Sequence, residues 1–384
     1  MFAIFCGIFS VLAWLYLLLA RGGFWQVGRH LPPAKLTGQS SCRVAVIVPA
    51  RNEAEVIGQG ISSILHQTGS HSIHIFLIDD ASTDGTAEIA GQAAAESGRS
   101  STLTIIQGRP LPSGWTGKLW AVHQGIERAR EFAPQFFLLT DADILHAPDN
   151  IATLVAVAEQ GAYDLASFMV KLHCDTLAER FLVPAFVFFF FKLYPPSWID
   201  DPRRKTAGAA GGSILVRPEA LERAGGIEAI RNEIIDDCAL ARAVKDQGGK
   251  LWLGLTGATA SLRPYRTFRE VGSMISRSAF NQLHHSVLML LAALIGLTMI
   301  YLLPPLLVFA HRPLPVALGA SAWLLMTLAY LPMVRFYRLN PLWGLALPLT
   351  AIFYMGATLH SAFRFWSGRG GEWKGRTQDR EGES

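Results

Sequence analysis

The sequence predicts an α/β protein with a mostly parallel central sheet and with membrane-spanning helices near both ends. Strand-like and helix-like segments alternate through residues 40–280, which is typical of a layered sheet with right-handed crossovers. Hydrophobic residues make up 51% of the chain, charged residues only 17%, and the mean hydropathy is +0.29 because long apolar runs flank that region. Acidic side chains follow several of the predicted strands, so candidate ligands gather at one edge of the sheet.

The first apolar run predicts an N-terminal membrane anchor over residues 1–21. It extends from Phe2 to Ala20 without a charge and ends at Arg21, and its length suits a spanning helix. A cleaved signal peptide is the alternative, but no basic region precedes the run and no small-x-small site follows it. We therefore expect the anchor to be retained.

Three further runs predict a membrane domain over residues 286–362. Each is long enough to span a bilayer, and Pro304 with Pro305 should kink or end the first one. A polar tail is expected over residues 363–384, with disorder from Ser367 to Ser384. Basic residues lie beside these runs, so the net charge of +4 indicates membrane topology rather than nucleic-acid binding. The three runs are 286–310, 314–334 and 342–362.

The domain between these membrane segments, expected over residues 40–280, begins with alternating strands and helices. Its strands are short apolar runs, and its helices carry apolar residues at helical spacing, with Asn52 expected to cap the first helix. The strands are expected at 43–49, 74–79, 103–106 and 136–140, and the helices after Asn52, at 83–96 and at 118–130.

One run within this domain, Phe181–Phe191, is apolar but too short to span a bilayer comfortably. It is either core or an in-plane element at the bilayer surface. The phenylalanines and the nearby Trp198 favour the surface, because aromatic side chains are enriched at membrane interfaces.

Asp141 and Asp143 form the most informative pair in the chain. Both follow the apolar strand 136–140, and two carboxylates at a strand end can hold a divalent cation against a diphosphate. A surface turn is the alternative, but a charged pair directly after five buried strand residues favours metal binding. Glu53 and the pair Asp79-Asp80 follow two other strands, and Asp79 or Asp80 could accept hydrogen bonds from a nucleobase or ribose. A first-turn helix carboxylate is the plainer role of Glu53.

Asp236 and Asp237 open a later predicted helix. They could serve only that helix terminus, but a carboxylate pair also raises one pKa, which suits a general base. Lys118 enters a helix from a glycine-containing loop, where it is either a phosphate contact or a surface lysine. Arg277, just before the membrane runs, could face a leaving diphosphate or a lipid phosphate. Four separated cysteines with no CxxC support neither a zinc site nor a disulfide framework.

Taken in order, these motifs closely resemble glycosyltransferase family 2, which has the GT-A fold. The resemblance covers roughly residues 42–280 and rests on an ordered set rather than on one motif. Its pieces are Pro49-Ala-Arg-Asn-Glu53, Asp79-Asp80-Ala-Ser-Thr-Asp84-Gly85, Gly117-Lys118-Leu-Trp-Ala121, Asp141-Ala-Asp143 and Asp236-Asp237.

The resemblance implies a role for each matching residue. Glu53 and Asp80 would hold the nucleoside of a nucleotide-sugar donor, and Asp141 would contact the ribose or the diphosphate. Pro49, Asp79, Lys118 and Arg277 would also bind the donor. Asp143, with Asp141, would bind Mg²⁺ or Mn²⁺, and Asp237 beside Asp236 would deprotonate the acceptor. Gly211-Gly212 would form a tight loop beside that acceptor. Such enzymes usually invert the anomeric centre by direct displacement.

Within the family, three features resemble the hopanoid-biosynthesis-associated glycosyltransferases. They are the segment from Gly114 to Ala121, the segment from Ala210 to Arg217, and the anchor with C-terminal spans. Processive relatives carry a Gln-x-x-Arg-Trp motif. The corresponding segment of this chain is Met274-Ile-Ser-Arg277-Ser278, which retains only the arginine. The usual asparagine of the Gly-Lys helix is replaced by His123.

These observations predict a membrane enzyme that transfers a sugar from a nucleotide sugar to a lipid, with a hopanoid as the candidate acceptor. A polyprenyl-phosphate sugar synthase and a non-catalytic membrane scaffold are the alternatives. A cytoplasmic catalytic domain would place the basic C-terminal tail outside if all three C-terminal runs span. Either one run is interfacial or the charges of the tail are too weak to set its side.

Overall fold

The computed structural model describes residues 1–32, 41–368, 372–373 and 376–377, and it divides into two compact units. The helical unit holds residues 1–29, 174–197 and those from 265 to 368. The sheet unit holds the described residues of 30–173 and 198–264. Residues 174–197 and 265–280, which the sequence assigned to the catalytic domain, pack instead among the apolar helices. The predicted disorder of the tail falls mainly on residues outside the described ones.

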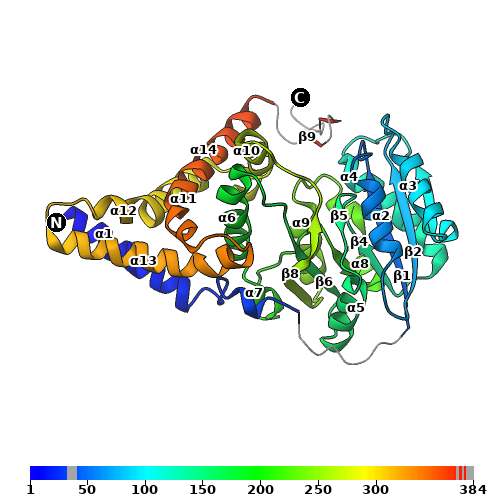
Figure 1. Cartoon of the computed structure of the whole chain (residues 1–384), viewed down its shortest axis with the longest axis horizontal. Coiled ribbons are helices and arrows are strands. Elements are labelled where there is room, and N and C mark those ends of the chain that lie inside the picture. The colour runs from blue at the N-terminus through cyan, green and yellow to red at the C-terminus, as the bar shows by residue number, and fades with distance from the viewer. Residues whose placement is uncertain (33–40, 369–371, 374–375, 378–384) are drawn as a thin grey trace. The chain divides into compact units, whose positions relative to one another are not determined.

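An eight-stranded mixed sheet forms the centre of the sheet unit (Figure 1). Its order is β3-β2-β1-β4-β7-β6-β8-β5, with parallel pairing from β3 to β4 and between β6 and β8. The strand β7 pairs antiparallel with both its neighbours, and β5 pairs antiparallel with β8. The strands are β1 Arg43–Ala50, β2 Ser72–Asp79, β3 Leu103–Gln107, β4 Phe136–Leu139, β5 Ile144–Leu145, β6 Leu165–Lys171, β7 Ile214–Val216 and β8 Leu251–Ser261.

Helices join and cover these strands, and the predicted α/β alternation is confirmed. They are α2 Ile57–Leu65, α3 Thr86–Glu96, α4 Gly117–Ala129, α5 Asn150–Gln160, α7 Pro196–Asp200, α8 Pro218–Arg223 and α9 Asp236–Asp246. Short 3-10 turns lie at Ser100–Thr102, Arg130–Phe132 and Ile227–Ile230. A two-stranded ladder, β9 Glu372–Trp373 with β10 Arg376–Thr377, lies near the C-terminus.

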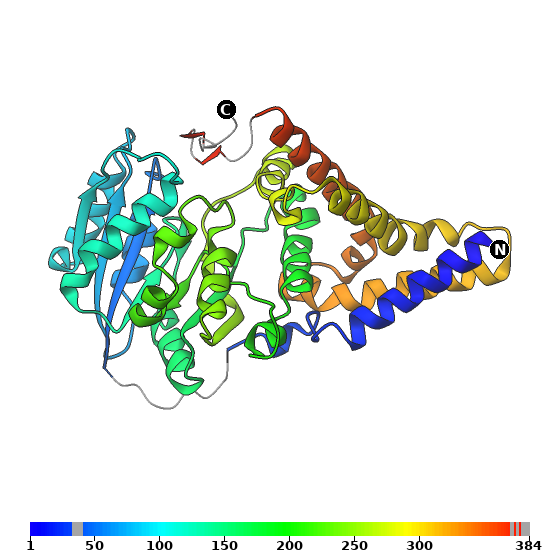
Figure 2. The same ribbon diagram turned by 180° about the vertical axis from the view of Figure 1, so that it is seen from behind.

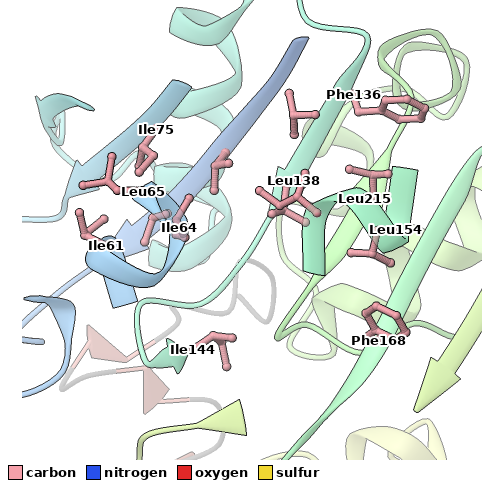
Figure 3. Packing of buried hydrophobic residues seen from close by; sticks show 14 of the residues in the cluster. Ile61, Ile64, Leu65, Ile75, Phe136, Leu138, Ile144, Leu154, Phe168 and Leu215 are labelled. Carbon is pink, nitrogen blue, oxygen red and sulfur yellow. The ribbon is translucent and has the colours of Figure 1, made fainter. Parts of the chain in front are cut away.

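The core of the sheet unit lies between the sheet and the helices α2 and α5. Every residue of β1 after Arg43 is buried, because this central strand is covered on both faces. Figure 3 shows Ile61 and Ile64 of α2 on one side of this core, with Leu138 of β4 and Leu154 of α5 on the other. A buried strand covered on both faces requires a continuous apolar run, and a helix on its surface requires an apolar face. These are the two sequence patterns from which β1 and α2 were predicted.

Two local predictions differ from the structure. Asn52 does not cap α2, whose N-cap is Val56, since the side-chain oxygen of Asn52 accepts instead from the amide of Thr83 at 2.9 Å. The next helix, α3, begins at Thr86 rather than at residue 83, because Gly85 adopts the left-handed conformation (φ 84°) that starts it.

The helical unit contains four helices long and apolar enough to cross a membrane. They are Phe2–Leu19 (α1), Val287–Leu307, Pro313–Phe336 (α13) and Pro341–Trp366, which correspond to the four predicted runs. The second span consists of α11 Val287–Leu297, a π-helical turn and α12 Leu303–Leu307, and the fourth consists of a 3-10 turn at Pro341–Ala346 and α14 Leu347–Trp366. The other elements of this unit are α6 Leu177–Leu193, α10 Phe268–Ser276 and 3-10 turns at Val27–Arg29 and Asn281–Leu283.

The helices α1 and α13 run side by side in both views (Figures 1 and 2), and two glycines let helices approach closely. A Cβ on Gly7 would come within 2.9 Å of Leu318, and one on Gly319 within 2.6 Å of the carbonyl oxygen of Pro304. Small residues at helix contacts are the usual means of packing helices in membranes.

The prolines in the second candidate span act as predicted. The residues Thr298–Leu302 form a π-helical turn directly before Pro304, and α12 ends at Leu307. Proline has no N–H, so the carbonyl four residues earlier in the chain loses its helical donor. That carbonyl, of Ile300, accepts from the indole nitrogen of Trp14 at 2.9 Å.

The phenylalanine-rich run corrects the expectation of a surface element. It lies in α6, and Phe188, Phe189 and Phe191 are at most 9% exposed, packed within the helical unit. Their rings meet those of other helices, as between Phe188 and Tyr330 of α13. The run is therefore core, because neighbouring apolar helices cover the side chains that the sequence alone would leave for lipid.

Candidate active site

Lys118 joins two of the predicted acidic groups. Its ammonium lies 2.8 Å from Oδ1 of Asp141, just beyond β4, and 2.9 Å from Oδ2 of Asp236, in the first turn of α9. Burial disfavours its charge, but the two carboxylates outweigh that effect and raise the pKa of Lys118. The plain role of a surface lysine is therefore excluded, and the direct contact is with carboxylates.

The start of α4 places this lysine. The hydroxyl of Thr116 accepts from the amide of Leu119 at 3.3 Å, which caps the helix, and the amide of Thr116 donates to the carbonyl of Arg231 at 2.8 Å. Lys118 thus leaves the first turn of a helix that is tied to the segment before α9. The sequence pattern of a glycine-containing loop entering a helix is confirmed.

Asp237 faces the acceptor loop predicted at Gly211-Gly212. Its Oδ2 accepts from the amide of Gly211 at 2.9 Å, and its Oδ1 accepts from the amide of Cys238 at 2.7 Å. Burial, and then the neighbouring carboxylate of Asp236, raise the pKa of Asp237 to about 6. A carboxyl group with such a pKa is deprotonated at neutral pH and is basic enough to accept a proton in catalysis.

The acceptor loop is held against the end of β4. The hydroxyl of Thr140 donates to the carbonyl of Gly212 at 2.7 Å, and a Cβ on Gly212 would come within 2.8 Å of Val170. Only glycine fits that position without a shift of the loop. A Cβ on Gly211 would meet its nearest atom, Oδ2 of Asp237, at an ordinary 3.5 Å.

A buried polar network that the sequence reasoning missed supports the same strand end. Nε2 of His146 lies 3.0 Å from Oγ1 of Thr140, and Nδ1 lies 3.0 Å from the side-chain nitrogen of Asn150. Burial lowers the pKa of His146 to about 4, so its ring is neutral at physiological pH. Asn150 also bonds to Ser213 at 3.2 Å and to Thr259 at 2.9 Å. The network ties β4 to β7 and β8.

A second set of charges surrounds Asp143. Nε of Arg263 lies 3.3 Å from Oδ2 of Asp143, and the hydroxyl of Ser261 donates to the same oxygen at 2.8 Å. The guanidinium of Arg263 also donates to both oxygens of Glu53, at 2.7 and 2.6 Å. Arg263 was not identified from the sequence. A single basic residue after the strand β8 was the only signal, and it has no recognisable spacing.

The loops after β1 and β2 are locked together by hydrogen bonds. Oδ2 of Asp84 accepts from the amide of Ala54 at 3.0 Å, and the hydroxyl of Thr86 accepts from the amide of Glu53 at 2.9 Å. Asp84 thus positions the backbone that carries Glu53, while its Oδ1 accepts from the amide of Thr86, the first residue of α3, at 3.1 Å. Bonds of this kind explain why the Asp79–Gly85 segment and the Pro49–Glu53 segment form one edge of the site.

Asp79 and Asp80 lie at the end of β2 and are 4% and 3% exposed. The amide of Ser82 donates to Oδ1 of Asp79 at 3.2 Å, and the guanidinium of Arg51 lies 3.6 Å from Oδ2 of Asp80. The end of β3 passes close by, since a Cβ on Gly108 would come within 3.1 Å of the carbonyl of Asp79. The chain after β3 therefore packs directly against the backbone at the end of β2.

One pocket collects six of the predicted residues, and others lie elsewhere. Leu139, Ile214, Ile227 and Leu240 contribute apolar walls to it. The predicted residues that line it are Pro49, Lys118, Asp141, Gly211, Asp236 and Asp237. Glu53, Asp79, Asp80, Asp143 and Gly212 do not line this pocket. Arg277 is exposed at the C-terminal end of α10, in the helical unit, and its contact with a diphosphate stays a prediction.

The carboxylates fit a divalent cation that binds together with a diphosphate. Among residues 1–32 and 41–368, no group of three or more His, Cys, Asp or Glu side chains is placed to hold a metal by itself. Mg²⁺ is commonly held by one or two carboxylates plus substrate phosphates, and Asp141 and Asp143 can supply the carboxylates. Arg263 would have to give up its contact with Asp143 for that ligation.

A comparison with protein families finds one similar family for most of the sheet unit. Residues 45–225 match the family described as glycosyl transferase family 2. This part of the chain is therefore similar to glycosyltransferase family 2. The match supports glycosyltransferase activity and agrees with the resemblance carried by the ordered motifs. The hopanoid-associated subfamily stays a prediction.

The glycosyltransferase fold extends over nearly the whole chain. The structure is similar to that of mannosyltransferase PcManGT from Pyrobaculum calidifontis, which was solved in complex with GDP-Man and Mn²⁺. The TM-score is 0.54 at 18% sequence identity, and the match covers 95% of this chain and 99% of that one. At this identity the likeness shows the fold alone, and it confirms the predicted GT-A fold.

Two curated relatives of the transferase domain act on lipids according to their names. An undecaprenyl-phosphate 4-deoxy-4-formamido-L-arabinose transferase of Pseudomonas savastanoi pv. phaseolicola is 33% identical over 143 residues, which is 36% of this chain and 38% of the relative. A 4,4'-diaponeurosporenoate glycosyltransferase of Staphylococcus aureus is 28% identical over 222 residues, which is 57% of this chain and 56% of the relative. The matches thus cover between about a third and a little over half of the relatives' lengths.

Proposed function

We propose that this glycosyltransferase is a membrane-bound, inverting enzyme that moves a sugar from a nucleotide-diphosphate sugar to a lipid, with the transferase domain in the cytoplasm. The hydroxyl group of a hopanoid is the candidate acceptor. The observation that carries this proposal is the bridge from Asp141 through Lys118 to Asp236. It supports the proposal because Asp141 and the half-buried Asp237 line one pocket.

The donor would lie along the carboxyl ends of β1, β2 and β4. Glu53, Asp79 and Asp80 would bind the nucleoside, with Pro49 forming part of the pocket wall. Asp141 and Asp143 would hold Mg²⁺ or Mn²⁺ against the diphosphate, and the cation would neutralise charge that develops on the leaving diphosphate. The ammonium of Lys118 would then exchange its contact with Asp141 for a contact with the same phosphates.

The acceptor step follows from the geometry of Asp237. Its carboxylate would accept the proton of the lipid hydroxyl while that oxygen attacks the anomeric carbon. The bond from this carbon to the diphosphate oxygen breaks with its electron pair on the leaving group, and the configuration inverts. The amide of Gly211 holds Oδ2 of Asp237 at 2.9 Å, which would fix the orientation of the base.

A second candidate function, sugar transfer to a lipid with an ionised terminus, is favoured by the names of the two relatives. Undecaprenyl phosphate ends in a phosphate and diaponeurosporenoate in a carboxylate. Such an acceptor is already a nucleophile and needs no strong base. The role of Asp237 therefore separates the two candidate functions.

The test uses the full-length protein in detergent, several nucleotide sugars, and lipid extract as the acceptor. Release of nucleoside diphosphate is measured with and without Mn²⁺. With a hydroxyl acceptor, Asp237→Asn should lower turnover by about 10²- to 10⁴-fold, while donor binding measured by calorimetry stays unchanged. Asp246→Asn, at the exposed end of the same helix, is the matched control.

The outcomes separate the candidates. Full turnover by Asp237→Asn with undecaprenyl phosphate, and none with hydroxyl lipids, would replace the first proposal by the second. Loss of metal-dependent release in Asp143→Ala is also expected. A failure of every nucleotide sugar to bind the wild-type protein would remove both candidates and leave a non-catalytic scaffold.

A further inference from the structure

The helical unit carries a lysine whose charge has no role in the proposed transfer. Lys192 lies in the last turn of α6, next to the buried phenylalanines. Its ammonium donates to the hydroxyl of Tyr301 at 2.9 Å. It also lies over the rings of Phe189 and Tyr301, 4.9 Å from each centroid. The cation is thus partly buried in an aromatic surrounding.

No carboxylate among the described residues balances the charge of Lys192. Within the described part of the chain, no Asp or Glu oxygen lies within 4.0 Å of the ammonium, and the hydroxyl of Tyr301 is its one hydrogen-bond partner. An ammonium has three N–H donors, so two of them remain for another group. Burial, together with the nearby Arg21, lowers the pKa of Lys192 to about 8, as expected for a cation without a counter-ion.

A second cation strengthens the positive potential at this end of α6. Nε of Arg21 donates to the carbonyl of Lys192 at 3.0 Å, and its Nη2 donates to the carbonyl of Leu193 at 3.4 Å. Arg21 follows the first candidate span after Ala20, so these bonds bring the end of that span to the end of α6 that carries Lys192. Two cations beside apolar helices suit a negatively charged group attached to a hydrocarbon chain.

The hydroxyl of Tyr301 is held in place for such a group. Tyr301 belongs to the π-helical turn before Pro304, and the ring of Trp14 packs edge-on against it with centroids 5.4 Å apart. The hydroxyl of Ser10 donates to the carbonyl of Met299 in the same turn at 2.6 Å. With its oxygen accepting from Lys192, the hydroxyl of Tyr301 keeps its own proton for an anionic acceptor.

We propose that Lys192 and Tyr301 form a binding site for the anionic terminus, a phosphate or a carboxylate, of a membrane lipid. The phosphate can come from a bulk phospholipid or from a monoester lipid such as a polyprenyl phosphate. The site lies wholly within the helical unit, and the proposal does not rest on the transfer reaction proposed above.

The test measures lipid binding to the full-length protein in detergent by native mass spectrometry, without any nucleotide sugar. Undecaprenyl phosphate is compared with undecaprenol, which has the same chain and no charge. The wild-type protein should prefer the phosphate by about tenfold or more, the equivalent of one or more charge-assisted hydrogen bonds. Lys192→Met should reduce this preference to within about twofold, and Lys192→Arg should keep most of it.

Two further variants protect the interpretation. Tyr301→Phe keeps the ring packing and removes only the hydroxyl, so it should weaken phosphate binding even if Lys192→Met folds poorly. Arg180→Met, which removes an exposed charge from the other end of α6, should leave the preference unchanged. Equal phosphate preference in the wild type, Lys192→Met and Tyr301→Phe would overturn the proposal.

Competition identifies the source of the anion. Phosphatidylglycerol that displaces undecaprenyl phosphate at equal concentration would support the site and assign it to bulk phospholipid. Phosphatidylglycerol without effect would support the site and assign it to a monoester. Displacement that is identical in Lys192→Met would place the bound lipid elsewhere and overturn the proposal.

Discussion

At the scale of the residue, the carboxylates of the candidate site are held by cations of the protein itself. Lys118 pairs with Asp141 and Asp236, and Arg263 pairs with Asp143 and Glu53. Acidic groups brought together at a strand edge repel one another, and interleaved cations remove that cost before any substrate binds. The same cations must be rearranged when a diphosphate and a metal arrive.

The pH dependence of transfer should report the protonation of Asp237. In the proposed reaction the deprotonated form is the base, and burial, followed by the carboxylate of Asp236, raises the pKa of Asp237 to about 6. With a hydroxyl acceptor, kcat/KM should therefore be constant above that pH and fall by about tenfold per pH unit below it. The residual activity of Asp237→Asn should lack this acid limb. An acid limb that persists in the variant would assign the titration to another group.

Arg263 should compete with the divalent cation for Asp143. Arg263→Gln removes the charge 3.3 Å from Oδ2 of Asp143, so Mn²⁺ should bind about tenfold more tightly in the absence of a donor. The measurement is the loss of the free Mn²⁺ signal in electron paramagnetic resonance. Arg128→Gln, on the exposed face of α4, is the control. Unchanged or weaker Mn²⁺ binding in Arg263→Gln would contradict this competition.

At the scale of the element, the site depends on strand ends and the loops between them. Parallel pairing of β1 with β2 and β4 brings three acidic segments to one edge. Antiparallel β7 then places the acceptor loop beside the end of β4, where Thr140 holds the carbonyl of Gly212 at 2.7 Å. The α9 helix supplies Asp236 and Asp237, the proposed catalytic pair, from its first turn.

The two glycines of the acceptor loop should differ in their tolerance of a side chain. Gly212→Ala would press its Cβ against Val170 at 2.8 Å, which should destabilise the fold by about 1–3 kcal/mol. Gly211→Ala meets only ordinary contacts and should change stability by no more than about 0.5 kcal/mol. Thermal unfolding of both variants measures the difference, and Val170→Ala should partly restore Gly212→Ala. Equal destabilisation of the two variants would show that the contact with Val170 is not the cause.

At the scale of the whole molecule, one sheet unit and one helical unit share a chain that passes between them more than once. The helical unit contains four helices able to span a membrane, one before the transferase domain and three after it. Its internal contacts include polar bonds between candidate spans, such as that from Trp14 to the carbonyl of Ile300. These bonds suit an apolar surrounding, where an unpaired carbonyl is costly.

The number of candidate spans predicts the side of the C-terminus. If all four helices cross the membrane, three crossings separate the transferase domain from the tail, so the tail lies on the opposite face. Single cysteines placed at Ser367 and at Ser100, in a background without native cysteines, can be labelled from outside intact cells by a membrane-impermeant maleimide. Only the cysteine at 367 should react. Protection of both positions would show that one of the three C-terminal helices does not cross.

The sequence by itself determined the α/β alternation, the four apolar runs and the convergence of acidic residues at strand ends. These features follow from local periodicity and from the rule that parallel strands end at a common edge. Only the tertiary structure decided which charges meet. Arg263 reaches Asp143 across 120 positions of the chain because β8 pairs with β5 and β6, and no local pattern encodes that neighbour.

The difference between local pattern and tertiary contact also explains why the prediction for Phe181–Phe191 was wrong. It explains too why the sequence left the contact of Lys118 open. Whether apolar side chains face lipid or other helices depends on which helices surround them, and α6 is enclosed. Whether a lysine at a helix start meets solvent, phosphate or carboxylates depends on the approach of α9, 118 positions along the chain from Lys118 to Asp236. Periodicity is a local property, whereas charge pairing and burial are properties of the assembled fold.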